Sequence, residues 1–355
     1  MKTETVAAVH DRRRRSGTAA TERAVDLLRK GEVVALPTET VYGLAADALN
    51  PIAVAKIFEA KQRPRFDPLI VHLPDKQWLE RVAKIDNRSR AQINDLIAKF
   101  WPGPLTLVLN RQPIVPEIVT AGLDTVAFRM SSHPVFAEII STFAKPVAAP
   151  SANRFGRISP TTAEHVFDEL NGRIPLIIDA GPTTHGIEST IIALHEGNIR
   201  ILRHGPITAE QLSEFARIHI ATRSGKISAP GQLPAHYAPK KPLQLIDNAE
   251  TFMPKGKQRV GLLAWNPLSR KGDLGMAQRR TGDRRSLGFV AVRHLSESQD
   301  LREAAANLFR CLRELDEVDL ELIVAERVPA QGLGAAILDR LERASRDSDI
   351  RDTPE

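Results

Sequence analysis

The sequence predicts two α/β domains joined by a linker. From about residue 18 to residue 203, short apolar runs typical of strands alternate with segments whose apolar residues recur at helical spacing. Residues 222–242 are rich in Pro, Gly and Ser and lack an apolar period, which is typical of a linker. A shorter set of strands and helices follows, and 355 residues suffice for two domains. We therefore expect an open, twisted, largely mixed sheet with helices, followed by a linker and a smaller α/β domain.

The first domain shows its elements in a regular order. The apolar run 33–36 ends at Pro37, as expected of a buried strand. Asn50 and Pro51 predict a helix start, because Asn caps helices and Pro is tolerated in the first turn. The segment 89–100 places its apolar residues on one helical face. We expect strands at 33–36, 69–73, 105–109, 125–129, 146–149, 175–179, 189–194 and 199–203, and helices at 20–29, 51–60, 89–100, 134–143, 162–170 and 208–216.

The two ends and the second domain complete the predicted organisation. Residues 1–17 contain four consecutive arginines in an aperiodic context, so we expect a disordered basic segment. The predicted domains are a first domain over 18–206, a helix and Pro/Gly-rich linker over 207–242, a small domain over 243–345 and a polar tail over 346–355. In the small domain we expect strands at 259–264, 289–294 and 320–325 and helices at 300–314 and 334–345.

The composition favours a protein that binds anions. The net charge of +6 and the pI of about 9.5 suit nucleotides, bicarbonate, carboxylates and RNA. Only 5% of the residues are aromatic, which supplies a base-stacking surface poorly. A single cysteine, Cys311, excludes an internal disulfide and a cysteine-rich metal site. No apolar run approaches a membrane span and no secretory core follows the N-terminal charges, so we expect a cytoplasmic location.

The most informative stretch of the chain is 31–74. It contains a short strand, a polar corner with Thr38 and Thr40, a helix, and a second strand that contains His72. Lys61 and Arg63 stand between the helix and the second strand. This arrangement is suited to a small polar substrate beside a polyphosphate.

The two cations of this stretch are expected to act together. Pro64 disfavours helix at Arg63, so the segment 61–63 is expected to be extended, with Lys61 and Arg63 on one face. Two cations on one face can bind a single anion. The alternative is that Lys61 only complements the carbonyl end of the preceding helix. We favour the anion site, because the Lys-x-Arg-Pro pattern leads directly into the strand that contains His72.

Further polar groups stand at the ends of other predicted strands. Ser151 and Asn153 follow the run 146–149, at the edge of the sheet where α/β proteins bind ligands, although both are also common turn residues. Arg129 and Arg203 each end a strand. Ser189 precedes the apolar part of another strand, but without the Gly-x-Ser-x-Gly elbow it is no hydrolase nucleophile.

Standard nucleotide-binding motifs are missing. The Gly-Lys pair at 225–226 lacks the upstream glycine of a P-loop, and the Gly-Leu-Gly segment 332–334 lacks the third glycine of a dinucleotide fingerprint. Any ATP site would therefore have to combine scattered cations, hydroxyls and backbone amides. The linker carries two rings, His236 and Tyr237, although a simple tether needs none.

Taken together, these segments resemble the two-domain form of the threonylcarbamoyl-AMP synthase family. The likeness covers a YrdC-like domain at about 18–206, the His-Tyr-Ala-Pro segment of the linker, and a small Rossmann-like domain with its VGLLA strand and closing GLGAAILDRLERAS helix. It implies synthesis of threonylcarbamoyl-AMP from L-threonine, bicarbonate and ATP, with release of pyrophosphate and water. A tRNA threonylcarbamoyl transferase complex would then modify adenosine in ANN-decoding tRNAs, so that any contact with tRNA is indirect.

The resemblance also implies a role for individual residues. Threonine would be held by Thr40, His72, Arg129, Ala149 and Ser189. Lys61 and Arg63 would be the catalytic cations, on the phosphates and bicarbonate. The nucleotide would further contact Asp67, Thr125, Ser151, Asn153, Ser159, Arg203 and, as a lid on the linker, Tyr237. Mg²⁺ is expected with ATP, without direct protein ligands.

One departure and one alternative bear on this interpretation. Asp67 stands where the family usually has Asn, and a carboxylate near ATP would repel it unless a cation such as Arg65 pairs with it. The alternative is a non-catalytic RNA-binding module, which would depend on scattered surface cations and bind with strong salt dependence. The related hydrogenase-maturation carbamoyltransferases carry zinc-type cysteine clusters, which are absent from this sequence.

Overall fold

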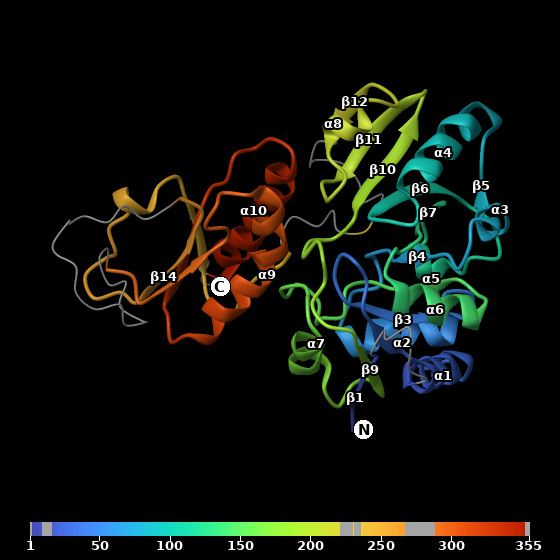
Figure 1. The fold of residues 1–355 in the computed structure, drawn as a ribbon, viewed down its shortest axis with the longest axis horizontal. Helices are drawn as coiled ribbons and strands as arrows, with labels where there is room; N and C mark the ends of the chain where they lie inside the picture. The colour runs from blue at the N-terminus through green and yellow to red at the C-terminus, as the bar shows by residue number, and fades with distance from the viewer. Residues whose placement is uncertain (1, 9–15, 221–229, 231–235, 267–287, 352–355) are drawn as a thin grey trace. The chain divides into compact units, whose positions relative to one another are not determined.

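The chain forms two compact units, each with its own sheet (Figure 1). The computed structural model describes residues 2–8, 16–220, 230, 236–266 and 288–351. The first unit comprises Met1–Phe155 and Ser159–Pro234, and the second comprises Gly156–Ile158 and Ala235–Glu355. The short segment 156–158 therefore belongs to the second unit although it interrupts the sequence of the first. Most of the predicted linker and the arginine run 12–15 lie outside the described residues.

The first unit is built on a mixed sheet, as predicted. Parallel and antiparallel pairs alternate irregularly along it, with β2 antiparallel to β3 but parallel to β9. The strands follow the order β1 (Glu4–Ala7), β9 (Leu176–Asp179), β2 (Val34–Leu36), β3 (Gly43–Asp47), β8 (Val147–Ala148), β4 (Ile70–His72), β7 (Thr125–Arg129), β6 (Leu105–Arg111), β10 (Thr190–His195), β11 (Asn198–Arg203) and β12 (Ile218–Ile220), with β5 (Ala83–Lys84) beside β6.

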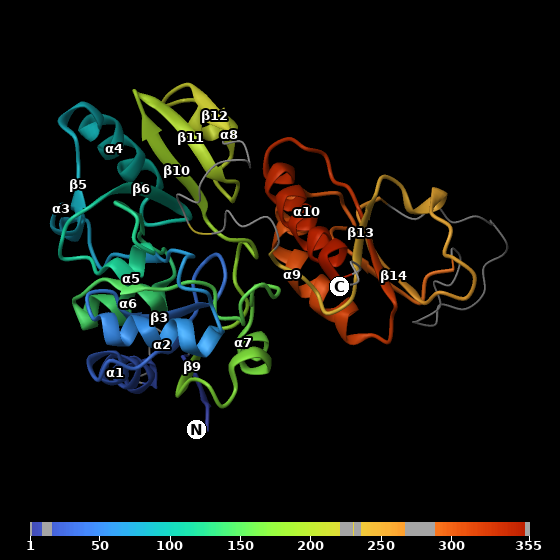
Figure 2. The ribbon, with the colours of Figure 1, turned by 180° about the vertical axis from the view of Figure 1, so that it is seen from behind.

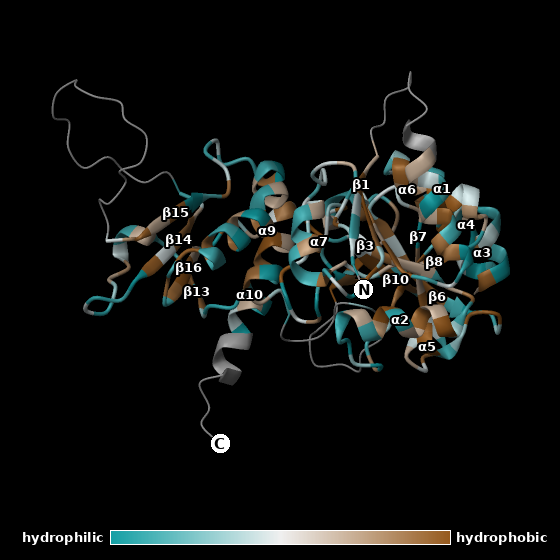
Figure 3. Ribbon diagram, turned by 90° about the horizontal axis from the view of Figure 1, so that it is seen from below, coloured by the Kyte–Doolittle hydropathy of each residue, from teal (hydrophilic) through white to brown (hydrophobic). Residues whose placement is uncertain are grey.

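Helices cover both faces of the part of the sheet around β2. Because side chains alternate along a strand, Val34 and Leu36 join the core under α1 (Ser16–Arg29) and α6 (Pro134–Phe143), while Ala35 joins the core on the other face. That second core contains residues of α2 (Pro51–Lys61), α4 (Asn87–Phe100) and α7 (Ala163–Leu170). Apolar residues accordingly lie along the strands and alternate with polar residues along the helices (Figure 3). Short helices α3 (Gln77–Val82), α5 (Glu117–Thr120) and α8 (Ala209–Leu212) complete the unit.

The sheet carries a separate apolar patch near its centre. On β4, β6, β7, β10 and β11, the side chains opposite the α2 and α4 core form a cluster of Ile70, Val108, Ala127, Ile191 and Leu202. We call these five residues the apolar floor. Three of these strands end in residues of the candidate site described below: β4 in His72, β7 in Arg129 and β11 in Arg203.

Several predictions about local structure need correction. Residues 4–7 are not disordered but form β1, which pairs with β9. The strand β3 lies between the polar corner and the helix, where the sequence analysis expected no strand, and β5, β12, α3 and α5 were also missed. The predicted helix 208–216 is only the one-turn α8, whereas α1 begins earlier than expected, at Ser16.

The second unit is a small parallel α/β sheet. Its strands have the order β13 (Leu243–Ile246), β16 (Leu322–Glu326), β14 (Val260–Ala264) and β15 (Ala291–His294), and every pair is parallel. The 3-10 helix η1 (Ala249–Thr251) follows β13, while α9 (Leu301–Glu317) and α10 (Leu333–Arg351) follow β15 and β16. Figure 2 labels both helices together with β13 and β14. The prediction missed β13, and the segment 346–351, expected as a tail, continues α10.

Candidate active site

The corner after β2 is held by the hydroxyl group of Thr38. Its Oγ1 accepts the backbone N–H groups of Thr40 at 3.1 Å and Val41 at 3.2 Å, and it lies 2.8 Å from the hydroxyl of Thr40. Such local bonds favour a tight turn over continuation of the strand. The turn places Glu39 and Thr40 in the interior, where both are buried.

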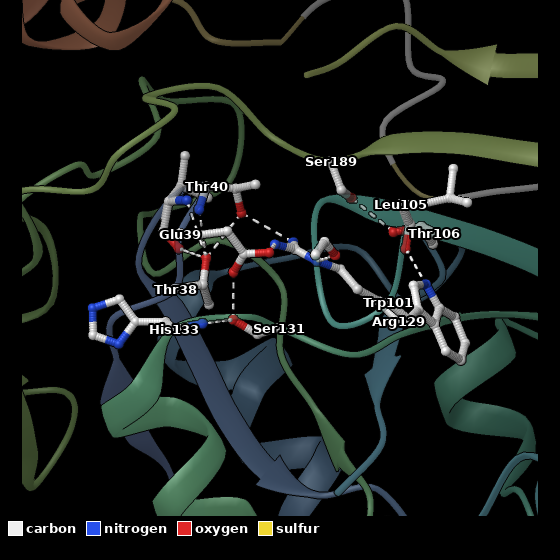
Figure 4. Close-up of polar contacts among 12 residues, drawn as sticks. Thr38, Glu39, Thr40, Trp101, Leu105, Thr106, Arg129, Ser131, His133 and Ser189 are labelled. Carbon is white, nitrogen blue, oxygen red and sulfur yellow. Dashed lines mark hydrogen bonds and ion pairs between the residues drawn. The ribbon is translucent and has the colours of Figure 1, made fainter. Parts of the chain in front are cut away.

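Arg129 and Glu39 form a buried ion pair beside this corner (Figure 4). Arg129, the last residue of β7, donates from Nη2 to Glu39 at 2.6 Å and from Nη1 to the Thr40 hydroxyl at 2.9 Å. The other carboxylate oxygen of Glu39 accepts the hydroxyl of Ser131. Burial raises the pKa of Glu39, but Arg129 and Ser131 outweigh it and hold that pKa at about 2. Glu39 is therefore ionised at neutral pH.

His72 lies next to Arg129 in the sheet and carries no charge at neutral pH. The two residues are paired in the register of β4 and β7, and the His72 ring packs on Phe136 at a centroid distance of 4.9 Å. Burial, and secondly the charge of Arg129, lower the pKa of His72 to about 3. Its Nδ1 is buried and accepts no hydrogen bond from the part of the chain that the structure describes. The Ala149 backbone is close enough to His72 to influence its pKa.

Ser189 connects Arg203 with the start of β6. The hydroxyl groups of Ser189 and Thr106 lie 2.7 Å apart, and Arg203 Nη2 donates to the Ser189 hydroxyl at 3.1 Å (Figure 4 shows the Ser189–Thr106 contact). Arg203 also donates to the backbone oxygen of Ser189 from Nε and Nη2. The structure thus brings Arg203, which ends β11, to the residue that precedes β10.

Lys61 braces the segment that carries Ser151 and Asn153. It is the last residue of α2 and is 1% exposed. Its Nζ donates to the backbone oxygen of Ser151 at 2.5 Å and to that of Asn153. Burial, and secondly the charge of Arg63, lower the pKa of Lys61 well below its ordinary value. These bonds to the backbone of Ser151 and Asn153 show that Lys61 does more than complement the carbonyl end of α2. Its predicted contact with phosphate stays a prediction.

Arg63 is paired with Asp67. Its Nη2 lies 2.8 Å from Asp67 Oδ2, and both side chains are buried. The expected partner, Arg65, is exposed, so that pairing is wrong. The residue after the helix, Gln62, adopts a left-handed conformation with φ 53°, so the segment 61–63 is not simply extended. This turn directs Arg63 toward Asp67.

Of three further predicted ligands of the nucleotide, Ser159 bonds to the residue before Ser189, Thr125 lies at the other end of β7 from Arg129, and Tyr237 belongs to the second unit. Ser159 donates to Glu188 at 2.5 Å. Thr125 begins β7 and Arg129 ends it, which at ~3.3 Å per residue separates their Cα atoms by about 13 Å. Thr125 lies two residues before Ala127 of the apolar floor and lines a cavity of about 260 Å³ with Asn110, Arg200 and other residues. Thr125 therefore lies at the opposite end of β7 from Arg129, and its predicted contact with the nucleotide stays a prediction.

Tyr237 belongs to the second unit. Its ring stacks on Phe309 of α9 at 5.4 Å, and the guanidinium of Arg340 from α10 lies 5.5 Å from its centroid. The ring of His236 meets it edge-on at 4.1 Å. These contacts explain why the segment carries two rings, and the predicted lid role of Tyr237 stays a prediction.

Four polar residues of these groups were missed by the sequence analysis: Glu39, Thr106, Ser131 and Glu188. For Glu39 a signal existed, because an acidic residue three positions after a buried strand needs a cationic partner if it is buried too. Among the described residues, no group of three or more His, Cys, Asp or Glu side chains could hold a metal ion. Within the same described ranges, no helix has the length and apolarity to cross a membrane.

Comparisons with known proteins cover both parts of the chain. A family model described as "Telomere recombination", of the Sua5, YciO and YrdC group, matches residues 26–205, and one described as "Threonylcarbamoyl-AMP synthase, C-terminal domain" matches residues 207–346. The chain is 38% identical to the threonylcarbamoyl-AMP synthase of Pyrococcus abyssi, over 91% of this chain and 93% of that one. It is 39% identical to the enzyme of that name from Bacillus subtilis, over 93% and 94% of the two chains.

A solved structure shows the same fold over nearly the whole chain. The crystal structure of P. abyssi Sua5 complexed with L-threonine matches with a TM-score of 0.81 and 36% identity, and the match covers 98% of each chain. The predicted YrdC-like fold of the first domain is therefore confirmed. With family models matching both parts and relatives matching over nine-tenths of its length, the chain belongs to the threonylcarbamoyl-AMP synthase family.

Proposed function

We propose that this protein is an enzyme that makes threonylcarbamoyl-AMP from L-threonine, bicarbonate and ATP, with release of pyrophosphate and water. The proposal rests on two groups of polar side chains in the first unit. The chain that carries them is related along its length to synthases of that name. One group contains Arg129, Thr40 and His72, and the other contains Arg63 and Arg203.

The first group suits an amino acid. The guanidinium of Arg129 supplies positive charge for a carboxylate, and the uncharged imidazole of His72 can accept a hydrogen bond without repelling an ammonium group. The hydroxyl groups of Thr40 and Ser189 can hydrogen-bond to the threonine side chain. The amine must lose its proton before it adds to the carbon dioxide derived from bicarbonate, and this addition forms the carbamate.

The second group suits the triphosphate. An oxygen of the carbamate attacks the α-phosphorus, the bond to the β-phosphate oxygen breaks, and pyrophosphate leaves. No protein nucleophile is needed, so the side chains act by orientation and by stabilising developing negative charge. In this proposal Arg63 and Arg203 would stabilise such charge, and Lys61 holds the backbone of Ser151 and Asn153. Mg²⁺ would enter with the ATP phosphates and neutralise part of their charge.

The product is a mixed anhydride that water hydrolyses, so it must be protected and passed on. We propose that Tyr237 contributes to a lid that excludes water. The consumer would be a transferase that moves the threonylcarbamoyl group to adenosine in ANN-decoding tRNAs.

The test is release of pyrophosphate from ATP by the full chain. We expect release only when threonine and bicarbonate are both present, with threonylcarbamoyl-AMP formed in equal amount. Serine should serve roughly 10–100-fold less well, because it lacks one methyl group. Release that ignores threonine would refute the proposal. Salt-sensitive RNA binding without any adenylate product would instead support the alternative of an RNA-binding module.

A further inference from the structure

The contacts of Arg63 leave its charge occupied. Its Nη2 pairs with Asp67 Oδ2 at 2.8 Å and donates to the Pro68 backbone oxygen at 2.8 Å, and its Nε donates to the Asp67 backbone oxygen at 3.2 Å. The side chains of Arg63 and Asp67 are 6% and 2% exposed. Nε and Nη2 form one of the two-donor edges with which a guanidinium binds phosphate. In this arrangement both donors of that edge face the segment 67–68.

Only one of the two carboxylate oxygens of Asp67 has a polar partner in the described part of the chain. Its Oδ1 is buried and accepts no hydrogen bond within the described chain. The charged groups that face it are Lys61 at the end of α2, Arg63 in the following loop and Arg203 at the end of β11. Burial raises the pKa of Asp67, and these three cations only partly offset that effect. The carboxylate therefore takes up a proton more readily than an exposed aspartate does.

We propose that Asp67 is an internal counter-ion that competes with the triphosphate for Arg63 and thereby limits the affinity of this protein for ATP. The inference rests on the proposed function, in which ATP is the nucleotide substrate. A phosphate group that approaches Arg63 brings a second anion to a buried pair. Either the phosphate and Asp67 repel each other, which weakens ATP binding, or Asp67 takes up a proton, which removes the competing charge.

The asparagine variant separates the charge of Asp67 from its shape. Asp67→Asn keeps an oxygen that can accept from Arg63 but removes the negative charge. Asp67→Ala removes both, so Arg63 loses the contact that orients it. We call Lys61, Arg63 and Arg203 the cation group. Exposed Asp95 of α4 lies outside it and offers a matched control, since Asp95→Asn changes the net charge by the same amount.

The experiment measures ATP affinity of the full chain by titration calorimetry without threonine, between pH 6 and pH 8.5. We expect Asp67→Asn to bind ATP about three- to tenfold more tightly than the wild type at pH 8.5. The difference should shrink as the pH falls, because protonation gives the wild type the same neutral group. The ionisation of ATP affects both proteins equally and cancels in the ratio. Asp67→Ala should gain no affinity, and Asp95→Asn should match the wild type.

A second measurement needs no variant. In buffers of different ionisation enthalpy, ATP binding to the wild type at pH 8 should take up a fraction of a proton, and Asp67→Asn should lose that uptake. Equal affinity of Asp67→Asn and wild type at every pH would overturn the inference while leaving the proposed function intact. Tighter binding by Asp67→Asn without proton uptake by the wild type would support the inference, with repulsion rather than protonation as the cause. Failure of the wild type to bind ATP at all would overturn both.

Discussion

The first unit contains two buried pairs of arginine and carboxylate that look alike and behave differently. Arg129 lies 2.6 Å from Glu39, and Arg63 lies 2.8 Å from Asp67. The pKa of Glu39 is lowered to about 2, whereas that of Asp67 is raised. The difference teaches that a neighbouring arginine alone does not fix the charge of a buried carboxylate.

The two pairs differ at the second carboxylate oxygen. In Glu39 it accepts the hydroxyl of Ser131, while in Asp67 it is buried without a hydrogen bond from the described residues. Hydrogen bonds to the charged form offset the cost of burial, and an unsatisfied oxygen bears that cost in full. We therefore expect the Glu39 pair to be a fixed part of the fold and the Asp67 pair to respond to ligand and pH.

The largest effect on stability is expected from breaking the pair of Arg129 and Glu39. Arg129→Ala leaves the ionised Glu39 buried without its partner, which should lower the free energy of unfolding by about 3–5 kcal/mol. Urea denaturation at pH 7 measures this change. A loss below about 1 kcal/mol would show that the pair does not support the fold and would remove the contrast with Asp67.

The pH dependence of stability gives the next test. Because the pKa of Glu39 is held at about 2 in the folded protein, below its ordinary 4.5, its stabilisation is present above pH 4.5. That stabilisation, on the order of 3 kcal/mol, is lost as the pH falls from 4.5 toward 2. Glu39→Gln should be less stable than the wild type at pH 7, and the gap should narrow over that window. A gap that stays constant with pH would contradict the assignment.

Breaking the pair of Arg63 and Asp67 should affect activity more than stability. Arg63→Ala should reduce pyrophosphate release by about 10–150-fold, which corresponds to roughly 1.5–3 kcal/mol for a lost charged hydrogen bond. The melting temperature should change little, because Asp67 can take up a proton once Arg63 is gone. The matched control is Arg65→Ala, which removes an exposed cation two residues away and should retain activity. Equal loss in both variants would argue for a general effect of surface charge.

How much could be predicted from the sequence differs between local and long-range features. The strand 125–129 has the predicted bounds, because an apolar run with polar ends is a local signal. β3 has the sequence GLAAD, which carries no strand signal of its own, and it forms through pairing with β2 and β8. β1 is a short, mostly exposed edge strand whose existence depends on β9.

The candidate site follows the same division. Lys61 and Arg63 could be identified from their spacing, but their partners could not. Glu39 meets Arg129 across 90 positions of sequence, and only the fold brings them together. For Asp67, both Arg63 and Arg65 lie close enough in sequence to pair. The left-handed residue Gln62 directs the chain so that Arg63 enters the interior.

The smallest expected effect tests whether the cation group depends on the helix that leads to it. Asn50 caps α2 by accepting the backbone N–H groups of Ile52 and Ala53, so Asn50→Ala should cost about 1 kcal/mol of stability. Lys61, at the other end of α2, is held by its own bonds to the backbone oxygens of Ser151 and Asn153. ATP affinity should therefore stay within about twofold of the wild type, while urea denaturation reports the lost cap. A large loss of affinity would mean that α2 transmits strain to Lys61, and the cation group would then be as rigidly tied to the fold as the Glu39 pair.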